Sequence, residues 1–239
     1  MSYKEVRGSI FNSKAQALVN TVNCVGVMGK GIALEFRRRY PKIFKEYQCV
    51  CEKGELQPGQ ILPYRGGETW ILNFVIKNDW KQPSKVEWIE NCLKEFVSSY
   101  RDTGIKSAAF PWMGAMNGGI PIETIKKIMR NYLSNLTDID IEVYDFDPDA
   151  SDPLFEKLNN IVKSRYLNIK DLSKISDIQP RYMEKIIKAL QQENIRSLPR
   201  LIESGIIGKK NIEKLYAFLI GHPRINDSPY QTPLFSEGG

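Results

Sequence analysis

The sequence predicts an α/β fold, with helices flanking a mixed central sheet, followed by a small α-helical C-terminal domain. In the first 150 residues, short apolar runs typical of strands alternate with segments whose apolar residues recur at helical spacing. Glycine-rich loops follow two of these expected strands. Residues 161–220 read as helices and carry 12 Lys and Arg against 6 Asp and Glu, while the whole chain has a net charge of +6. A neutral α/β body and a basic helical part are therefore expected.

The expected elements of the body follow one another in a regular order. Strands are expected at 3–8, 17–23, 60–64, 69–76, 107–113 and 139–146. Helices are expected at 30–40, 41–53 and 122–133, and a further helix is expected to open with a capping-box pattern at 84–87. In a largely parallel sheet of this kind, ligand sites lie at the carboxyl ends of the strands.

Composition excludes several classes of protein. The 239 residues are 42% hydrophobic and 26% charged, which is ordinary for a globular protein, and no apolar run is long enough to span a membrane. The N-terminus has no apolar core of signal-peptide length, so a cytoplasmic protein without membrane contact is expected. The four cysteines form no metal-ligand spacing and His222 is the single histidine, so neither Ser-His-Asp chemistry, a metal site nor a cofactor is expected.

Two glycine-rich loops lie where expected strands end. Residues 26–33 read GVMGKGIA after the strand that ends near Asn23, and residues 111–121 read PWMGAMNGGIP before the helix expected from Ile122. Both present backbone N–H groups that suit an anion such as a phosphate. Each loop alone is equally explained as a tight turn that needs positive φ, but the pair favours a pyrophosphate ligand. Neither has the spacing of a P-loop or a Rossmann fingerprint, which excludes a kinase or a dehydrogenase.

Three segments together resemble the signatures of a macrodomain, the α/β module that binds ADP-ribose. They are ALVNTVNCVGVMGKGIALEF at 17–36, ILNFVIKNDW at 71–80 and PWMGAMNGGI at 111–120. Within that family, the first segment is similar to the DNA ADP-ribosyl glycohydrolase antitoxins (DarG-type) and to the terminal ADP-ribose glycohydrolases. The resemblance implies a macrodomain over residues 1–153.

The resemblance also implies an ADP-ribose site around the two loops. The first loop would close over the distal ribose and a phosphate through Gly26, Val27, Met28, Gly29, Lys30, Gly31 and Ile32. The second loop would wrap the other side of the pyrophosphate through Gly114, Ala115, Met116, Asn117 and Gly118. Asn23 matches a position that hydrogen-bonds the distal ribose, and Asn20 either joins it or holds the base of the loop.

The adenine end is expected near the first and last strands of the body. Ser9 and Ile10 occupy the slot of the family's adenine-contacting pair, and the Ser9 hydroxyl can accept a bond from the adenine amine. Tyr144 and Phe146 are candidates to stack on adenine, although Tyr144 is equally explained as a core residue.

Lys77 is the candidate catalytic residue, with Asn23 beside it at the distal ribose. Residues 73–77 read NFVIK and match the Asn-Phe-x-x-Lys motif of the glycohydrolases, whose lysine is catalytic. Without the resemblance, a lysine after an apolar strand is typical of a solvated charge. Partial burial would lower the pKa of the amine, which could then attack the anomeric carbon, and an electrostatic role toward the departing base is the alternative.

The second loop departs from the family pattern at two points. Met116 stands where glycine is usual, and Asn117 and Gly118 stand where the eukaryotic relatives have a carboxylate paired with their lysine. The missing carboxylate favours the bacterial branch of the family.

The basic part is expected to form a helical domain over residues 160–224, with a flexible tail at 225–239. After a link at 154–165, helices are expected at 169–175, 180–192 and 197–219. In the antitoxins that the chain resembles, the part after the macrodomain binds the cognate ADP-ribosyltransferase toxin. Nucleic-acid contact through residues 161–220 and simple packing on the macrodomain are the alternatives.

Two functions follow from the resemblance. The first is a glycohydrolase that removes ADP-ribose from a modified macromolecule, with a DNA base as the expected substrate and protein side chains as the alternative. The second is a module that binds ADP-ribose without hydrolysing it and recruits or neutralises a partner. The role of Lys77 decides between them.

Overall fold

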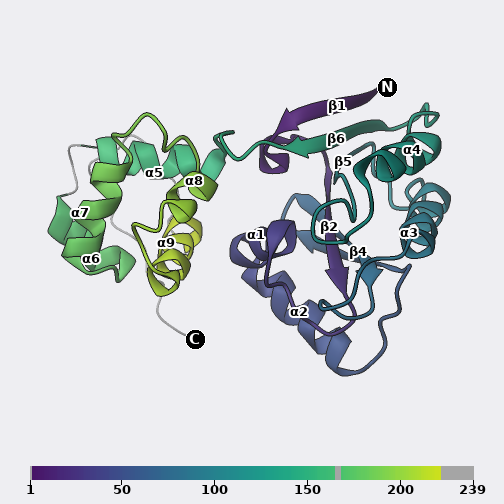
Figure 1. Ribbon diagram of the computed structural model, residues 1–239, viewed down its shortest axis with the longest axis horizontal. Helices are drawn as coiled ribbons and strands as arrows, with labels where there is room; N and C mark the ends of the chain where they lie inside the picture. Colours follow the sequence, from purple (N-terminus) through teal and green to yellow (C-terminus); the bar gives the residue numbers. More distant parts are fainter. Residues whose placement is uncertain (1, 165–167, 222–239) are drawn as a thin grey trace, which may run out of the picture. The chain divides into compact units, whose positions relative to one another are not determined.

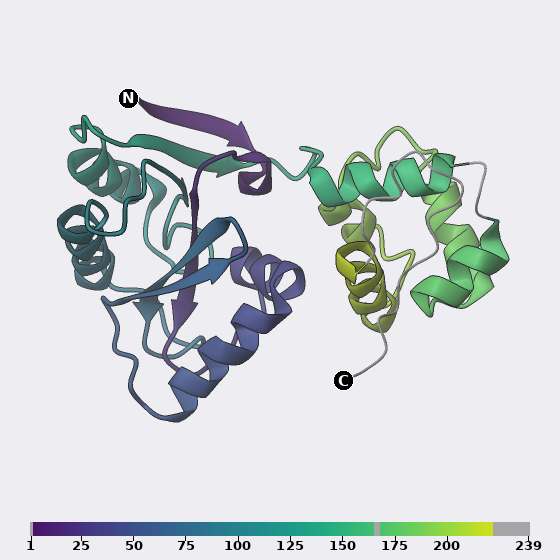
Figure 2. The ribbon, with the colours of Figure 1, turned by 180° about the vertical axis from the view of Figure 1, so that it is seen from behind.

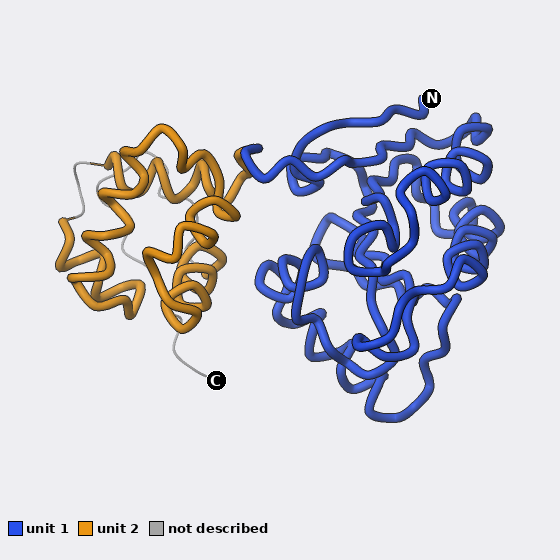
Figure 3. The backbone as a smooth tube through the Cα atoms, in the orientation of Figure 1, with its two compact units in different colours: residues 1–150 blue, residues 151–239 orange. Residues whose placement is uncertain are grey.

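The chain forms two compact units, Met1–Ala150 and Ser151–Gly239 (Figure 3). The computed structural model describes residues 2–164 and 168–221, so the flexible tail expected at 225–239 lies outside the described residues. Each unit encloses a hydrophobic core of its own. Among the described helices, none combines the length and the apolar character needed to cross a membrane.

The first unit is built on a mixed six-stranded sheet (Figure 1). Its strands are β1 (Tyr3–Gly8), β2 (Ala17–Asn23), β3 (Ile61–Gly66), β4 (Thr69–Lys77), β5 (Ser107–Pro111) and β6 (Asp140–Phe146). They lie in the order β1-β6-β5-β2-β4-β3, and every neighbouring pair is parallel except β3 with β4. The mixed sheet expected from the alternating sequence pattern is confirmed.

Helices cover both faces of this sheet (Figures 1 and 2). The helices of the first unit are η1 (Ile10–Asn12), α1 (Gly31–Arg39), α2 (Pro41–Glu52), α3 (Val86–Ser99) and α4 (Ile122–Leu133). α3 and α4 pack on the face that carries Phe74, and α1 and α2 pack on the face that carries Ile71 and Val75. Because successive side chains of a strand point to opposite faces, the continuous apolar run of β4 supplies both cores.

The capping-box pattern at residues 84–87 does not cap α3, so that expectation was wrong. The N-cap residue is Lys85, which makes no side-chain cap bond. Ser84 is buried, and its backbone N–H donates to the carbonyl of Gly118 at 2.9 Å. Ser84 is therefore tied to the second glycine-rich loop instead of the helix N-terminus.

The described part of the second unit is helical. Its helices are α5 (Pro153–Lys163), α6 (Ile169–Ser176), α7 (Pro180–Ala189), α8 (Leu198–Glu203) and α9 (Lys209–Gly221). The segment expected as a link at 154–165 is mostly α5, whose start is capped by the Asp152 carboxylate accepting from the Leu154 and Phe155 N–H groups. Leu158 and Ile161 of this helix join the core of the unit. The expectation of a linker was wrong because an Asp-Pro pair is itself a helix start signal.

The single helix expected at 197–219 is also divided. α8 ends at Glu203 and α9 begins at Lys209, and between them Gly205 adopts a φ of +67°. A glycine in the left-handed region is a common way to end a helix. The apolar spacing continues across this break, which explains why the sequence pattern suggested one long helix.

Candidate active site

The carboxyl ends of three neighbouring strands bring Lys77 and both glycine-rich loops together. β2 lies between β4 and β5 and is parallel to both, so the segments that follow these strands leave the same edge of the sheet. Asn23 at the end of β2 lies opposite Lys77 at the end of β4. The sheet thus places the two predicted catalytic residues side by side.

The side chain of Asn23 fastens the first loop. Its Oδ1 accepts from the backbone N–H groups of Val25 at 3.0 Å and Val27 at 3.2 Å, and its Nδ2 donates to the Val27 carbonyl at 2.6 Å. From α2, the Tyr47 hydroxyl donates to the Asn23 carbonyl at 2.6 Å. Asn23 is buried and acts as a positioning residue in this structure, so its contact with the distal ribose stays a prediction.

Two other predicted positions of this region face the interior. Asn20 is fully buried, and its Nδ2 donates to Oδ1 of Asn73 at 2.8 Å. Met28 is 2% exposed and packs in the cluster that contains Val22 and Val75. This apolar side chain turns into the core beneath the loop, so a contact of Met28 with ADP-ribose would have to come from its backbone and stays a prediction.

The remaining loop positions divide between surface and interior. Val27, Gly29, Lys30, Gly31, Met116 and Asn117 are exposed, Ile32 and Ala115 are half-buried, and Gly26, Gly114 and Gly118 are buried. Gly29 is the glycine that the fold does not explain: it lies outside the positive-φ region, and an added Cβ would meet a single side-chain atom of Val27 at 3.6 Å. The open space over Gly29 is suited to close approach of a ligand.

The second loop closes on its own backbone. A Cβ on Gly118 would collide with the carbonyl group of Gly114, so glycine is required at position 118. The Gly114 carbonyl also accepts from the Ile120 N–H at 3.1 Å. The two loops lie against each other, because the Asn117 amide of the second loop packs on Gly31 of the first. A Cβ added at Gly31 would lie only 2.5 Å from Nδ2 of Asn117.

Lys77 reaches the place where the two loops meet. Its Nζ donates to the Asn117 carbonyl at 2.6 Å. Burial lowers the pKa of the Lys77 amine from its ordinary value, because the charged form loses solvation. The structure therefore provides an amine with a reduced proton affinity at the place where the two glycine-rich loops meet.

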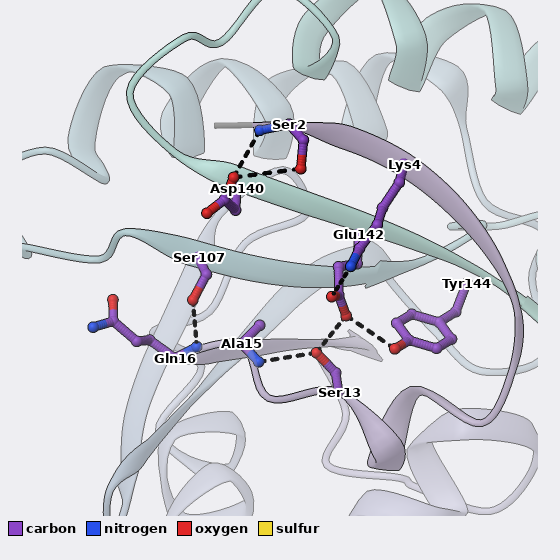
Figure 4. Close-up of polar contacts among 9 residues, drawn as sticks. All are labelled: Ser2, Lys4, Ser13, Ala15, Gln16, Ser107, Asp140, Glu142 and Tyr144. Carbon is purple, nitrogen blue, oxygen red and sulfur yellow. Dashed lines mark hydrogen bonds and ion pairs between the residues drawn. The ribbon is translucent and has the colours of Figure 1, made fainter.

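At the other end of the site, the structure separates the two predicted aromatic residues. Phe146 lies beside Gly8 in the pairing of β6 with β1, next to Ser9 and Ile10, and is 52% exposed. Tyr144 is 8% exposed, and its hydroxyl donates to Oε2 of Glu142 at 2.9 Å (Figure 4). Tyr144 is thus a core residue, and Phe146 remains the candidate to stack on adenine.

The carboxylate that holds Tyr144 belongs to a polar cluster in the first halves of β1 and β6, where Lys4 lies opposite Glu142. Glu142 also accepts from the Ser13 hydroxyl at 2.7 Å and pairs with Lys4 at 2.9 Å, and all of these side chains converge in Figure 4. Burial and the bond to Glu142 raise the pKa of Tyr144 to about 12. Burial and the bond to Glu142 hold the Tyr144 ring in the core, and Ser9 and Ile10 are also buried.

Comparison with known proteins identifies the first unit. Residues 19–129 match the sequence profile of the family described as Macro domain. The solved macrodomain of Mycobacterium tuberculosis DarG is 38% identical with a TM-score of 0.58, and the match covers 59% of this chain and 96% of that one. This chain belongs to the macrodomain family.

Longer relatives contain the same macrodomain. The DNA ADP-ribosyl glycohydrolase of Thermus aquaticus is 40% identical over 144 residues, which are 59% of this chain and 40% of that protein. The structure described as Thermosipho africanus DarTG in complex with ADP-ribose is 33% identical, has a TM-score of 0.58, and matches 64% of this chain and 43% of that chain. This chain thus spans about two fifths of the length of the curated relatives it matches.

Two positioning residues of the macrodomain site were missed by the sequence reasoning. Tyr47 supports the end of β2 from a neighbouring helix, and its place in an apolar helical pattern gave no sign of this contact. Asn73 bonds Asn20 inside the sheet, and here a polar residue within the apolar run of β4 was a usable signal. Among the described residues, no group of three or more His, Cys, Asp and Glu side chains forms a candidate metal site.

Proposed function

We propose that this macrodomain is an ADP-ribosyl glycohydrolase that removes ADP-ribose from a modified DNA base. The observation that carries the proposal is the position of Lys77, whose Nζ lies 2.6 Å from the Asn117 carbonyl where the two glycine-rich loops meet. The names of relatives support it further, since proteins 40% and 33% identical to this chain are described as a DNA ADP-ribosyl glycohydrolase and as a transferase–glycohydrolase fusion.

In the proposed complex, the pyrophosphate lies between the two loops and the distal ribose lies at Lys77. The backbone near Gly29 has no side chain to obstruct a phosphate, and N–H groups of both loops can donate to its oxygens. The adenine then extends toward Ser9 and the exposed ring of Phe146. This arrangement leaves the anomeric carbon and the base attached to it at the end of the site where Lys77 lies.

Two chemical routes at Lys77 are consistent with this placement. In the covalent route, the neutral amine bonds to the anomeric carbon while the bond to the base breaks, and the base nitrogen keeps the electron pair and takes up a proton. A water molecule then gives up a proton and bonds to the same carbon, and Nζ leaves with its electron pair. In the electrostatic route, the protonated amine stabilises the departing base without a covalent bond.

One observation favours a non-catalytic alternative. The bond from Lys77 to the Asn117 carbonyl also suits a lysine whose task is to hold the second loop in shape. The protein would then bind ADP-ribose and recruit or neutralise a partner. Hydrolysis assays of Lys77 variants separate the two functions.

The test compares wild type with Lys77→Ala and Lys77→Arg on ADP-ribosylated DNA oligonucleotides and ADP-ribosylated proteins. Lys77→Ala is expected to lower the rate of ADP-ribose release by at least about 100-fold while ADP-ribose affinity stays within a few-fold, because the pyrophosphate and adenine contacts are unchanged. Lys77→Arg should fail equally if the neutral amine attacks, since arginine stays protonated, and should retain part of the activity if the charge alone acts. Lys106→Ala, at the opposite end of the sheet just before β5, is the matched control and should be neutral.

The pH dependence of the rate distinguishes the two routes. If the neutral amine attacks, the rate rises with pH toward a midpoint below the ordinary lysine pKa, because burial lowers the pKa of Lys77. If the charged amine acts electrostatically, the rate falls through the same range. Equal rates for wild type and Lys77→Ala would mean that another residue is catalytic. If wild type hydrolyses neither substrate, the non-catalytic function, binding of ADP-ribose, is the one supported.

We infer that the second unit contacts DNA or the cognate transferase. α7 buries Met183 and Ile186 and exposes three cations, Arg181, Lys185 and Lys188. Glu184 is exposed on the same helix and pairs with Lys188 at 2.9 Å, so the outer face keeps a net positive charge. Replacing these three cations by alanine should weaken binding of an unmodified oligonucleotide and flatten its salt dependence, because fewer counterions are released. Unchanged DNA affinity would favour the protein partner, for which the transferase–glycohydrolase fusion of Thermosipho africanus is a precedent.

A further inference from the structure

The segment that joins β4 to α3 crosses the edge of the site beside Lys77. One of its ends is bonded to the residue that follows β2, and the other end is bonded to the second glycine-rich loop. The Cys24 N–H donates to the Asn78 carbonyl at 3.1 Å, and the Ser84 N–H donates to the Gly118 carbonyl at 2.9 Å. Residues 78–84 are therefore held to the same framework that positions the two loops.

A tight turn within this segment presents an indole ring. Oδ1 of Asp79 accepts from the Lys81 N–H at 2.8 Å, and the Asp79 carbonyl accepts from the Gln82 N–H at 3.1 Å. Trp80 lies at the tip of this turn and is 47% exposed. The Lys81 amine lies 5.4 Å from the centroid of the Trp80 ring. A large aromatic ring on a fixed turn, with a cation next to it, is a surface suited to binding rather than to core packing.

The ring does not stand alone at this edge. The exposed large apolar side chains in the described part of the first unit all lie at a carboxyl end of a strand or between that end and the first residue of the next helix: Val25, Val27, Trp80, Val86, Met116, Ile122 and Phe146. Met116 is 77% exposed and is the neighbour of Asn117, which binds Lys77. An apolar rim at one edge of a domain indicates a surface that receives a ligand larger than the site itself.

We propose that Trp80 is a stacking platform for a nucleobase of the single DNA strand next to the ADP-ribosylated nucleotide, with Lys81 contacting a backbone phosphate. The inference rests on the proposed function, in which Lys77 acts where the ADP-ribose joins the base. A base presents a flat π-face to an indole whatever its identity, and its phosphate carries the charge that a lysine attracts. A paired duplex hides its base faces, so the platform selects an unpaired strand.

Substitutions at the same position separate stacking from simple apolar contact. Affinities for a single-stranded oligonucleotide carrying one ADP-ribosylated base and for free ADP-ribose are measured in a Lys77→Ala background, so that the result does not depend on hydrolysis. Trp80→Leu should lower oligonucleotide affinity about tenfold relative to ADP-ribose affinity. Trp80→Phe retains a π-face and should recover most of the loss. Lys81→Ala should reduce the salt dependence of oligonucleotide binding, and the matched control Lys106→Ala should not.

Three outcomes of these measurements would overturn the proposal that Trp80 stacks on a nucleobase. An oligonucleotide affinity that Trp80→Leu leaves unchanged overturns the proposal, and so does an equal loss in Trp80→Phe and Trp80→Leu. Loss of affinity for an ADP-ribosylated protein without loss for the oligonucleotide would assign the surface to a peptide and overturn it as well. Failure of the proposed function is recognised separately, because wild type would then release no ADP-ribose while these binding differences could still be measured.

Discussion

The two glycine-rich loops of the site keep their shapes by opposite means. The first loop is held by a side chain, since Asn23 makes three bonds to its backbone. The second loop instead packs backbone against backbone, since Gly118 lies against the Gly114 carbonyl with no room for a Cβ. Glycine therefore has different meanings in the two loops: in the second it is required by the fold, whereas Gly29 in the first is left unexplained by any contact within the protein.

The largest expected effect comes from filling the open position of the first loop. Gly29→Glu places bulk and negative charge where the pyrophosphate is proposed to lie, so ADP-ribose affinity should fall by more than about 100-fold. Because Gly29 has neither a positive φ nor a close neighbour, the variant should fold normally. Calorimetric titration checks this, with the thermal unfolding midpoint as the control. A folded variant with wild-type affinity would show that the pyrophosphate lies elsewhere.

The same small substitution in each loop sharpens the contrast. Gly118→Ala forces a Cβ against backbone atoms that cannot move independently, and should lower the free energy of unfolding by about 1–3 kcal/mol. Gly29→Ala makes only an ordinary van der Waals contact with Val27 and should change the free energy of unfolding by no more than about 0.5 kcal/mol. Denaturant unfolding of the two variants measures the difference. Equal destabilisation would mean that the two loops are not held by different means.

A loss of stability smaller than that of Gly118→Ala is expected at the side chain that fastens the first loop. Asn23→Ala leaves the Val25 and Val27 N–H groups without their acceptor and should cost about 1–2 kcal/mol, since part of the loop can turn these groups to water. ADP-ribose affinity should fall with it, because the loop loses its fixed form. Asn23→Asp retains the acceptor and is the informative comparison. If Asn23→Ala weakened ADP-ribose binding without any loss of stability, a direct ribose contact would be the better explanation.

Much of the fold was predictable because local sequence and tertiary structure agree. The helix expected at 122–133 has those bounds in the structure. Its apolar residues recur at helical spacing, and the same residues are the ones buried in the core. The predictions that were wrong concern residues whose structure depends on contacts with groups distant in the sequence. Ser84 resembles a helix cap but is bonded to Gly118, and the residues of α5 resemble a link until the core they join is seen.

The site was predictable in position but not in the direction of its side chains. Sequence placed Lys77, Asn23 and both loops at strand ends, and the parallel strands bring those ends together. Whether a loop residue turns outward or inward depends on the packing beneath it, and no spacing rule applies in an irregular segment. The side chain of Met28 lies in the core although the residue was expected at the ligand, whereas Trp80, for which the sequence indicated no role, is exposed.

The buried pair Asn20 and Asn73 has a consequence for strand alignment. The two residues face each other across β2 and β4, and their amides bond at 2.8 Å. A slip of two residues would keep every side chain on its face but set Asn20 against Ile71 or Val75, burying two amides without partners at about 1–3 kcal/mol each. The Asn20–Asn73 pair thus favours one register of β2 with β4. The pair sets the alignment of β2 with β4 as far as Val22 opposite Val75, and an irregularity between Val22 and Asn23 then brings Lys77, instead of Ile76, opposite Asn23.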